Sequence, residues 1–297
     1  MIVIPGPASR GLGNLIAEEL GVQPHPAEHR FFPDGENYVR LTYPVEGEAT
    51  VIVQTTSPPQ DTRLMQLFML ARTAGDLGAE RVICVVPYLA YARQDKRFRG
   101  GEALSLDIVV HLLEEAGADD LIVIDAHNAE SLRRIQGGHG IGVENLSAVP
   151  LLAEYLKEMG YGGAYSLAPD RGAVHLAESG GEVLGGGSDF FEKRRSRRTG
   201  EVEMAVRELD IRGRDAVVFD DIISSGGTMA LAVAGLKRQG ARRVAAACTH
   251  GLFMGDAEER IREAGADLIV ATDAVESRFS LVSVAPIIAD RLRSMLS

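Results

Sequence analysis

Short apolar runs alternate with longer stretches of helical periodicity along the whole chain of 297 residues. Apolar runs of this length, rich in Val and Ile, are typical of strands that are buried on both faces of a parallel sheet. In the stretches between them, apolar residues recur every three or four positions, as in amphipathic helices. The pattern predicts strands at 2–4, 50–55, 82–86, 121–124, 166–168, 216–219, 244–248 and 268–271, and helices at 14–20, 64–77, 106–115, 151–159, 229–239 and 257–264.

This alternation predicts an α/β fold, and an internal sequence repeat predicts two copies of that fold. Residues 78–82, GAERV, are echoed by 240–244, GARRV, and residues 116–123, AGADDLIV, by 264–270, AGADLIV. Each Gly-Ala is typical of a helix end that leads into a strand, although two such common turns can also be alike by chance. We expect one domain at 1–142 and a second at 143–283, with 284–297 packing back on the first.

The composition narrows the class of protein. The chain is 45% hydrophobic and 25% charged, as in ordinary globular proteins, and no apolar run is long enough to predict a membrane span. The first residues, MIVIPGPAS, lack the basic region and the length of a signal peptide. Cys84 and Cys248 lie in apolar runs, which indicates buried thiols in a reducing, cytoplasmic compartment. A formal net charge of -11 argues against a nucleic-acid partner.

Residues 217–228, VVFDDIISSGGT, have the sequence of a strand, a turn of small residues and the start of a helix. Glycines at 226 and 227 allow an anion to approach the backbone, and the N-terminus of the following helix directs N–H groups at it. Ser224, Ser225 and Thr228 add hydroxyl donors. The alternative is that Asp220 caps a helix and the glycines form only a tight turn.

The presence of two carboxylates beside a predicted phosphate site requires a separate explanation. Asp220 and Asp221 directly follow the predicted strand, where negative charge would repel a phosphate. They are explained if they hold sugar hydroxyls or a divalent cation. A ribose 5-phosphate carries both a phosphate and a diol, so this segment predicts that class of ligand.

The first half carries other candidate binding residues. Phe32 lies in a turn with Asp34 and Glu36, an arrangement suited to a nucleobase and its amine, or else to a simple hairpin tip. Four cations within residues 93–99, RQDKRFR, follow a predicted strand and suit a polyphosphate, unless the loop is merely solvated. His127 also follows a strand, where it would bind Mg²⁺ or a phosphate, although a lone histidine usually does neither.

A strongly basic segment follows the middle of the chain. Five of the six residues at 193–198, KRRSRR, are basic, and residues 185–188, GGGS, precede them as an expected flexible hinge. Transfer of a phosphoryl-type group requires positioning and neutralisation of negative charge, which a cationic lid supplies. The alternative is a nucleic-acid or localisation patch, which the acidic chain and the preceding glycines disfavour.

Taken in order, the segments RFFPDGENYVRL, YARQDKRF followed by GEALS, DAHN, SLAPDRGA and VVFDDIISSGGT resemble the ribose-phosphate diphosphokinase (PRPP synthetase) family, in particular its short archaeal members. The resemblance covers about residues 2–292. It implies two similar domains of the phosphoribosyltransferase fold, each with a mainly parallel sheet flanked by helices. It also implies transfer of the β,γ-diphosphoryl group of ATP to the 1-hydroxyl of ribose 5-phosphate, with Mg²⁺ and without a nucleic-acid or membrane partner.

The resemblance also implies a role for individual residues. It assigns catalysis to Lys193 and Arg195, and Mg²⁺ binding to His127 and Asp170. The residues that it assigns to ATP are Phe32, Asp34, Glu36, Arg93, Gln94, Asp95 and His127. Those that it assigns to ribose 5-phosphate are Asp220, Asp221, Ser224, Ser225, Gly226, Gly227 and Thr228. Because family members form dimers and larger rings, a homodimer or higher homo-oligomer is expected.

Three departures from the family pattern affect these assignments. Many members have an acid and a Thr in place of Ser224 and Ser225, the segment DAHNAESL lacks the usual Gln and Phe, and extra arginines let Arg194 or Arg197 share the role of Arg195. Two rival functions remain. A nucleobase phosphoribosyltransferase would lack the ATP motifs, and a non-catalytic regulator would have lost the cations of the lid or the metal residues. The chain retains all of them.

Overall fold

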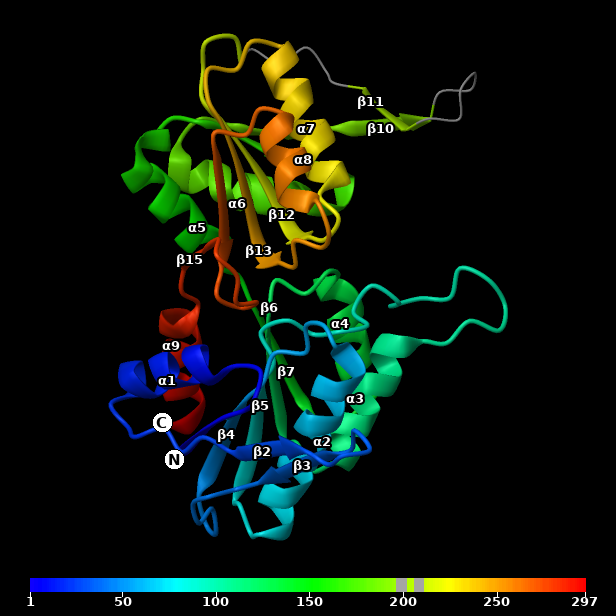
Figure 1. The fold of residues 1–297 in the computed structure, drawn as a ribbon, viewed down its shortest axis with the longest axis vertical. Helices are drawn as coiled ribbons and strands as arrows, with labels where there is room; N and C mark the ends of the chain where they lie inside the picture. Colours follow the sequence, from blue (N-terminus) through cyan, green and yellow to red (C-terminus); the bar gives the residue numbers. More distant parts are fainter. Residues whose placement is uncertain (196–201, 206–210) are drawn as a thin grey trace. The chain divides into compact units, whose positions relative to one another are not determined.

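The structure is a computed structural model that describes residues 1–195, 202–205 and 211–297, with the backbone alone at 192–195 and 202–205. The chain divides into two compact units. Unit 1 comprises Met1–Leu146 and Val284–Ser297, and unit 2 comprises Ser147–Ser283. Figure 1 shows a central sheet with helices in each unit.

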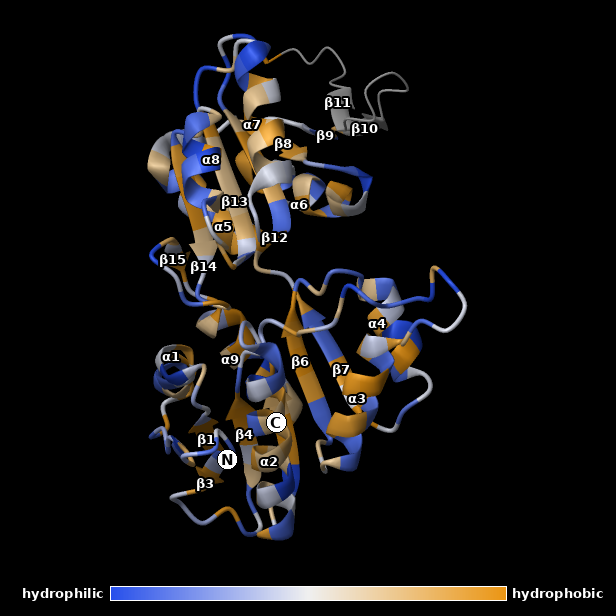
Figure 2. Ribbon diagram, turned by 45° about the vertical axis from the view of Figure 1, so that its right-hand side comes forward, coloured by the Kyte–Doolittle hydropathy of each residue, from blue (hydrophilic) through white to orange (hydrophobic). Residues whose placement is uncertain are grey.

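The sheet of unit 1 has five parallel strands in the order β1-β4-β5-β6-β7. Its central strands are buried on both faces, whereas the edge strand β7 is only half-buried, and Figure 2 shows the matching change from hydrophobic β6 to mainly hydrophilic β7. The strands are β1 (Ile2–Pro5), β4 (Ala49–Val53), β5 (Arg81–Val85), β6 (Asp120–Ile124) and β7 (Gly142–Leu146).

Helices α2, α3 and α4 bury their apolar faces together against this sheet. The first and last helices, α1 and α9, lie side by side, so the chain's last segment completes unit 1 (Figure 1). A separate antiparallel pair joins β2 (Glu28–Phe31) and β3 (Asn37–Arg40). The helices are α1 (Arg10–Leu20), α2 (Gln60–Asp76), α3 (Ser105–Glu115), α4 (Ala129–Gln136) and α9 (Ala285–Leu296).

Unit 2 has a six-stranded parallel sheet in the order β15-β14-β13-β12-β8-β9. Helices α7 and α8 cover one face, and α5 and α6 cover the other. The strands are β8 (Tyr165–Ala168), β9 (Ser188–Phe190), β12 (Ala216–Ile223), β13 (Val244–Gly251), β14 (Leu268–Thr272) and β15 (Ser280–Val282). The helices are α5 (Val149–Leu156), α6 (Val174–Leu184), α7 (Gly227–Arg238) and α8 (Ala257–Glu263), with single turns at Lys157–Tyr161 and Arg171–Ala173.

Each predicted strand and helix has a counterpart in the structure, and the predicted α/β class is confirmed. The pattern missed helices α4, α6 and α9, the edge strands β7, β9 and β15, the pair β2 and β3, and the strand pair at 192–195 and 202–205. Helix α6 was missed because two glycines interrupt it. They are packing positions: a Cβ on Gly180 would lie 2.4 Å from the ring of Phe219, and one on Gly181 would lie 3.2 Å from the carbonyl of Gly187.

Residues 185–188, which the sequence predicts to be a flexible hinge, make close backbone contacts with neighbouring segments in the structure. Gly185 ends α6 in a left-handed conformation (φ 79°), and the carbonyl of Gly187 accepts a hydrogen bond from Ser166 of β8 at 2.9 Å. A Cβ on Gly186 would lie 1.9 Å from the carbonyl oxygen of Ala164. These glycines therefore allow a close approach of backbones at the edge of the sheet.

The echo between the two halves corresponds to equivalent contacts. In unit 1, the carboxylate of Asp119 accepts from the N–H of Val82 at 2.7 Å, and the Asp119 N–H donates to the Val82 carbonyl at 2.9 Å. In unit 2, Asp267 makes the same two bonds with Val244, at 2.7 and 2.8 Å. The repeated sequence therefore builds the same turn at the amino-terminal edge of both sheets.

Candidate active-site residues in two units

The candidate phosphate cradle joins β12 to α7 in unit 2. Strand β12 continues through both acids as far as Ile223, and α7 begins at Gly227. No side chain caps the first turn of α7, so its N-terminal N–H groups face outward at the positive end of the helix dipole. Ser225 is exposed, and Ser224 and Thr228 are half-buried. The segment thus offers backbone and hydroxyl donors to an anion.

A neighbouring segment holds this cradle in shape. The N–H groups of Leu252 and Phe253 donate to the carbonyl of Ile223 at 2.9 and 3.1 Å, and that of Met254 donates to Ser224 at 2.9 Å. Phe253 adopts a positive φ of 41°, which is costly for a residue with a side chain. The strained backbone after β13 therefore fixes the loop after β12.

Within the cradle, Gly226 occupies a position where no other residue type fits without strain. Its φ of 75° lies in the left-handed region, and a Cβ there would lie 2.7 Å from the carbonyl oxygen of Ala257. By contrast, a Cβ on Gly227 would meet no heavy atom within 4 Å. The first glycine is therefore required by the fold of the loop, and the second leaves open space in front of the helix.

Three carboxylates lie at the carboxyl edge of two neighbouring strands of unit 2. Asp220 lies in β12, and Asp170 follows β8, which pairs with β12 in parallel. Burial raises the pKa of Asp220 well above its usual value of 3.8, and the charges of Asp221 and Asp170 raise it further. Asp170 also accepts from the N–H of Gly172 at 2.9 Å. Such mutual repulsion is relieved by a bound cation or by hydroxyl donors.

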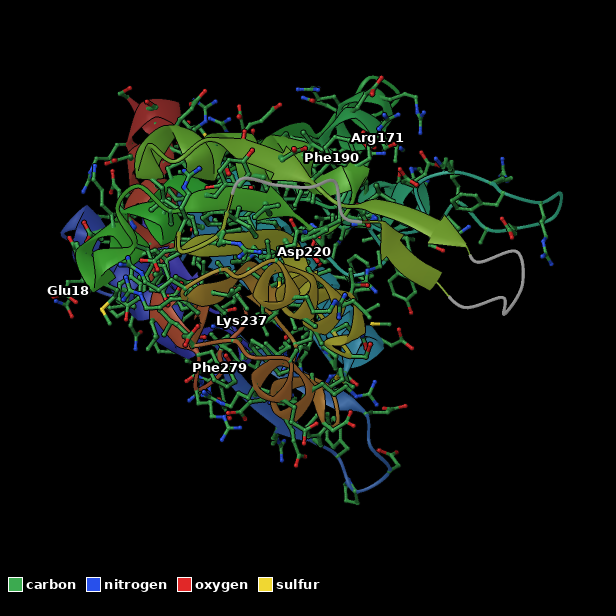
Figure 3. The ribbon with its side chains drawn as sticks, turned by 90° about the horizontal axis from the view of Figure 1, so that it is seen from above. Glu18, Arg171, Phe190, Asp220, Lys237 and Phe279 are labelled. Carbon is green, nitrogen blue, oxygen red and sulfur yellow. The ribbon has the colours of Figure 1, made fainter. Side chains whose placement is uncertain are left out.

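Arg171, which follows Asp170, lies beside an aromatic ring. Figure 3 shows its side chain next to Phe190, and its guanidinium lies 5.6 Å from the centre of the Phe190 ring. A cation over an aromatic face at this distance contributes about 0.5–1 kcal/mol at an exposed site. This contact fixes the end of the SLAPDRGA segment against β9.

The candidate ATP residues of unit 1 follow β5 and β6, which are neighbouring parallel strands. Arg93 is exposed, whereas Asp95 is 4% exposed and points inward. The Asn128 amide donates to the Asp95 carboxylate at 2.7 Å, and Arg134 donates to its carbonyl at 3.0 Å. Burial opposes ionisation of Asp95, but hydrogen bonds from Ser131 and Asn128 outweigh it and lower its pKa.

His127 is exposed in the turn between β6 and α4. Asp125, two residues earlier, has a positive φ of 38°, and Asn128 caps α4 by accepting from the Ser131 N–H at 3.0 Å. The N–H of Ala126 donates to the side chain of Asn145 at 2.8 Å. The backbone on both sides of His127 is therefore fixed, and the residue itself is exposed.

Phe32 lies in the turn between β2 and β3 and is 39% exposed. Its N–H donates to the carbonyl of Glu36 at 2.8 Å, and the N–H of Glu36 donates to the carboxylate of Asp34 at 3.2 Å. The guanidinium of Arg30 lies 5.3 Å from the Phe32 ring centre, and Tyr38 meets that ring edge-on at 6.0 Å. The turn thus holds a partly exposed aromatic ring beside two exposed acids.

Lys193 and Arg195 lie in β10 (Glu192–Arg195), which pairs with β11 (Val202–Ala205) in an antiparallel ribbon. The backbone places Lys193 opposite Met204 and Arg195 opposite Val202. Arg197 lies outside the residues that the structure describes. The proposed lid therefore contains a strand pair that is separate from the six-stranded sheet.

Comparisons with known proteins match both units. Residues 1–117 match the N-terminal domain of ribose phosphate pyrophosphokinase, and residues 151–275 match the phosphoribosyl transferase domain. The chain is 41% identical to the ribose-phosphate pyrophosphokinase of Methanothermobacter thermautotrophicus over 98% of this chain and 100% of that protein. It is 40% identical to that of Methanopyrus kandleri over 99% of each.

A solved structure agrees over the same length. The crystal structure of phosphoribosylpyrophosphate synthetase from Mycobacterium smegmatis is 30% identical and has a TM-score of 0.87, covering 99% of this chain and 98% of that one. The chain belongs to the ribose-phosphate pyrophosphokinase family. The predicted family and the predicted class of two phosphoribosyltransferase-like α/β domains are thus confirmed.

For this ribose-phosphate pyrophosphokinase, the sequence overlooked the residues that support the site. Asn128 and Arg134 hold the loop after β5 by bonding to Asp95, and the backbone at 252–254 holds the phosphate cradle. The positive φ values of Asp125 and Phe253 mark both supports. No local sequence signal identifies them, because their partners are 29 or more residues away along the chain. In the described part of the chain, no helix has the length and hydropathy of a membrane span.

Proposed function

We propose that in this ribose-phosphate pyrophosphokinase unit 1 binds ATP and unit 2 binds ribose 5-phosphate. The enzyme transfers the β,γ-diphosphoryl group of ATP to the 1-hydroxyl of ribose 5-phosphate, giving PRPP and AMP. One observation carries the assignment of unit 2: an acid pair and exposed hydroxyls lead directly into the uncapped N-terminus of α7. A ligand with a diol and a phosphate matches both parts.

In this proposal the 5-phosphate binds residues 224–228. The N–H groups at the start of α7 and the hydroxyls of Ser224, Ser225 and Thr228 donate to its oxygens. Asp220 and Asp221 accept hydrogen bonds from the ribose hydroxyls. The pKa of Asp220 is raised first by burial and then by the charges of Asp221 and Asp170, and hydrogen bonds from a sugar diol would stabilise these carboxylates.

For ATP, we assign the adenine to Phe32 with Asp34 and Glu36, and the phosphates to Arg93, Gln94 and His127. Arg93 suits a phosphate because it is exposed and forms no ion pair with the residues that the structure describes. We keep Asp95 with the ATP residues, and its buried carboxylate, which accepts from Asn128, also positions the loop.

The family is generally metal-dependent, and we propose Mg²⁺ as the ion. Mg²⁺ prefers oxygen ligands, retains several waters and takes few protein groups, which fits the carboxylate of Asp170 beside Asp220. We assign His127 to the same function in unit 1, near the phosphates. The bound ion would neutralise negative charge on the diphosphoryl group, and the residues around it orient the substrates.

We propose that Lys193 and Arg195 supply the catalytic cations. The transferring group carries charge on its equatorial oxygens, so a cation positioned there stabilises the transition state more than the bound ATP. One such interaction contributes about 3–4 kcal/mol. The 1-hydroxyl of a sugar hemiacetal is already fairly acidic, so no protein base is required.

The test measures AMP release from ATP with ribose 5-phosphate as a function of both substrates. Lys193→Ala should lower kcat by roughly 10²–10³-fold while leaving the ATP affinity nearly unchanged. Lys157→Ala, an exposed lysine of the same unit, is the matched control. Arg194→Ala and Arg195→Ala decide which arginine contributes. Unchanged kcat in Lys193→Ala would contradict the proposed catalytic role of the lid. Consumption of PRPP with nucleobases, without release of AMP from ATP, would contradict the proposed reaction.

We further propose a cytoplasmic homodimer or higher homo-oligomer. Cys84 and Cys248 are buried free thiols whose pKa is raised by burial, as suits a reducing compartment. In the turn that we assign to adenine, Phe31 and Phe32 are 55% and 39% exposed, which suits a surface covered by a second copy. Light scattering of the purified chain would contradict this if it gave the monomer mass at micromolar concentration.

A further inference from the structure

A cluster of metal-binding side chains lies in unit 1, apart from the residues assigned to substrates. Asp107, His111 and Glu114 occupy positions i, i+4 and i+7 of α3, so they share one face of that helix. His139, which follows α4, lies against the same face. Two imidazoles and two carboxylates thus meet at a half-exposed surface.

The contacts within this cluster are specific. Nδ1 of His139 lies 3.0 Å from Oε2 of Glu114, and Nε2 of His139 lies 3.2 Å from Oδ1 of Asp107. The ring of His111 lies 5.5 Å from the His139 ring, centre to centre. One ligand atom from each of His111, Glu114 and His139 lies within 4.8 Å of the other two. The N–H of Gly140 donates to the other oxygen of Glu114 at 2.7 Å.

We propose that His111, Glu114 and His139 bind a divalent transition-metal ion of the Zn²⁺ type. Zinc accepts imidazole nitrogen and carboxylate oxygen at about 2.0–2.2 Å, so tetrahedral ligand atoms lie about 3.3 Å apart. The distance from His139 Nδ1 to Glu114 Oε2 already matches this spacing. His111 is exposed, so its ring reaches the ion by rotating without displacing packed neighbours.

Asp107 completes the arrangement as a positioning residue. When Nδ1 of His139 binds the ion, Nε2 carries the proton and donates to the Asp107 carboxylate. Metal-bound histidines usually have such a carboxylate partner, which fixes the tautomer and the orientation of the ring. The two carboxylates together also balance the charge of a divalent ion.

The ligand chemistry distinguishes this site from the proposed Mg²⁺ residues. Two imidazoles and a single carboxylate favour Zn²⁺, Ni²⁺ or Cu²⁺, whereas Mg²⁺ prefers oxygen ligands only. A bound ion would join α3 to the segment after α4, adding to the hydrogen bonds of His139 and Gly140 and to the contact between the His111 and His139 rings. It would thus stabilise unit 1 around α4, the helix that follows His127.

The test is calorimetric titration of chelator-stripped, full-length protein with ZnCl₂ in the presence of excess MgCl₂. Relative to the unmodified chain, His111→Ala and His139→Ala should each lose roughly one equivalent of bound Zn²⁺. Two matched controls should keep it: His175→Ala, an exposed histidine of unit 2, and Glu115→Gln, an exposed acid next to Glu114. Equal stoichiometry in His111→Ala and the unmodified chain would overturn the proposal.

A second measurement guards against a folding defect in His139→Ala. His111 is exposed, so its substitution should leave the circular dichroism and the metal-free Tm unchanged. Zn²⁺ at ~100 times its Kd should raise the Tm of the unmodified chain by about 5 °C, and that of His111→Ala much less. The same rise in both proteins would also overturn the site.

Discussion

The two units have the same contacts at the amino-terminal edge of their sheets. At the carboxyl-terminal edge their loops differ in structure. At the amino-terminal edge, the bonds of Asp119 with Val82 recur between Asp267 and Val244. The glycines before those strands, Gly78 and Gly240, have φ values of 81° and 87°. Because these contacts end helices and start strands, they maintain the fold, and both units retain them.

The carboxyl-terminal edges use hydroxyl residues in opposite ways. After β4 in unit 1, Thr56 is fully buried, and its hydroxyl donates to the Tyr88 carbonyl and accepts from the Ala90 N–H, both at 2.8 Å. After β12 in unit 2, Ser225 is exposed and Thr228 is half-buried. The same position is therefore closed by internal hydrogen bonds in one unit and open to a ligand in the other.

The lengths of the loops at the carboxyl-terminal edge also differ between the two units. In unit 1 the long connection is 86–104, after β5, and it carries Arg93 and Gln94, two of the three residues that we assign to the ATP phosphates. In unit 2 the connection after β13 spans only 252–256, and it supports the cradle after β12. One scaffold thus presents ligand residues after different strands, because the carboxyl-terminal loops are free to vary while the strands are not.

The largest effect is expected from Gly226→Ala, which tests whether the open edge depends on this backbone. The left-handed φ and the contact with the Ala257 carbonyl should together destabilise the protein by about 2 kcal/mol. We expect kcat/KM for ribose 5-phosphate to fall by roughly 10²-fold, measured by AMP release. Gly227→Ala should keep the Tm, since its Cβ meets open space. Normal kcat/KM in Gly226→Ala would show that the cradle geometry is unimportant.

Asp221→Asn should separate binding from stability at the same edge. The KM for ribose 5-phosphate should rise roughly 10-fold or more, because a charged acceptor of a sugar hydroxyl is lost. The free energy of unfolding at pH 7 should rise by on the order of 1 kcal/mol, because a like charge beside Asp220 is removed.

The pH dependence gives the sign of this gain. Asp220 has a raised folded pKa, so its proton stabilises the fold fully below 3.8, and this contribution is lost as pH rises through the folded pKa. The difference between Asp221→Asn and the unmodified chain should therefore be near zero at pH 4 and grow toward pH 7. Urea denaturation at both pH values measures it, and a constant difference would contradict the repulsion.

The smallest effect is expected at the shared edge. Asp119→Ala and Asp267→Ala should each lower the free energy of unfolding by about 1 kcal/mol, a Tm decrease of about 2–4 °C, without changing kcat. Asp267 also pairs with Lys237 at 2.7 Å, so Lys237→Ala measures that contribution together with the bond from Lys237 to the Arg242 carbonyl. A loss of kcat in either aspartate variant would contradict the view that the amino-terminal edge only maintains the fold and the carboxyl-terminal edge serves function.

The sequence predicted the central elements well because burial fixes their pattern. Strands buried on both faces are mainly apolar, as at Val51, Ile52 and Val53. Edge strands such as β7 and β15 were not predicted, because they bury one side or less and carry polar residues. Helix α6 escaped because its glycines lower helix propensity, and the packing against Phe219 that requires Gly180 is not a local property.

By itself, the sequence determined the α/β class through its apolar pattern and the family through the resemblance of its ordered motifs, since both depend on residue type and order along the chain. Tertiary structure decided what distant residues do to one another. It showed Asp95 turned inward to Asn128, the glycines at 185–188 packed against a neighbouring strand, and His139 placed beside three polar residues of α3. Burial and hydrogen bonding between distant segments depend on the path of the whole chain, which no local pattern contains.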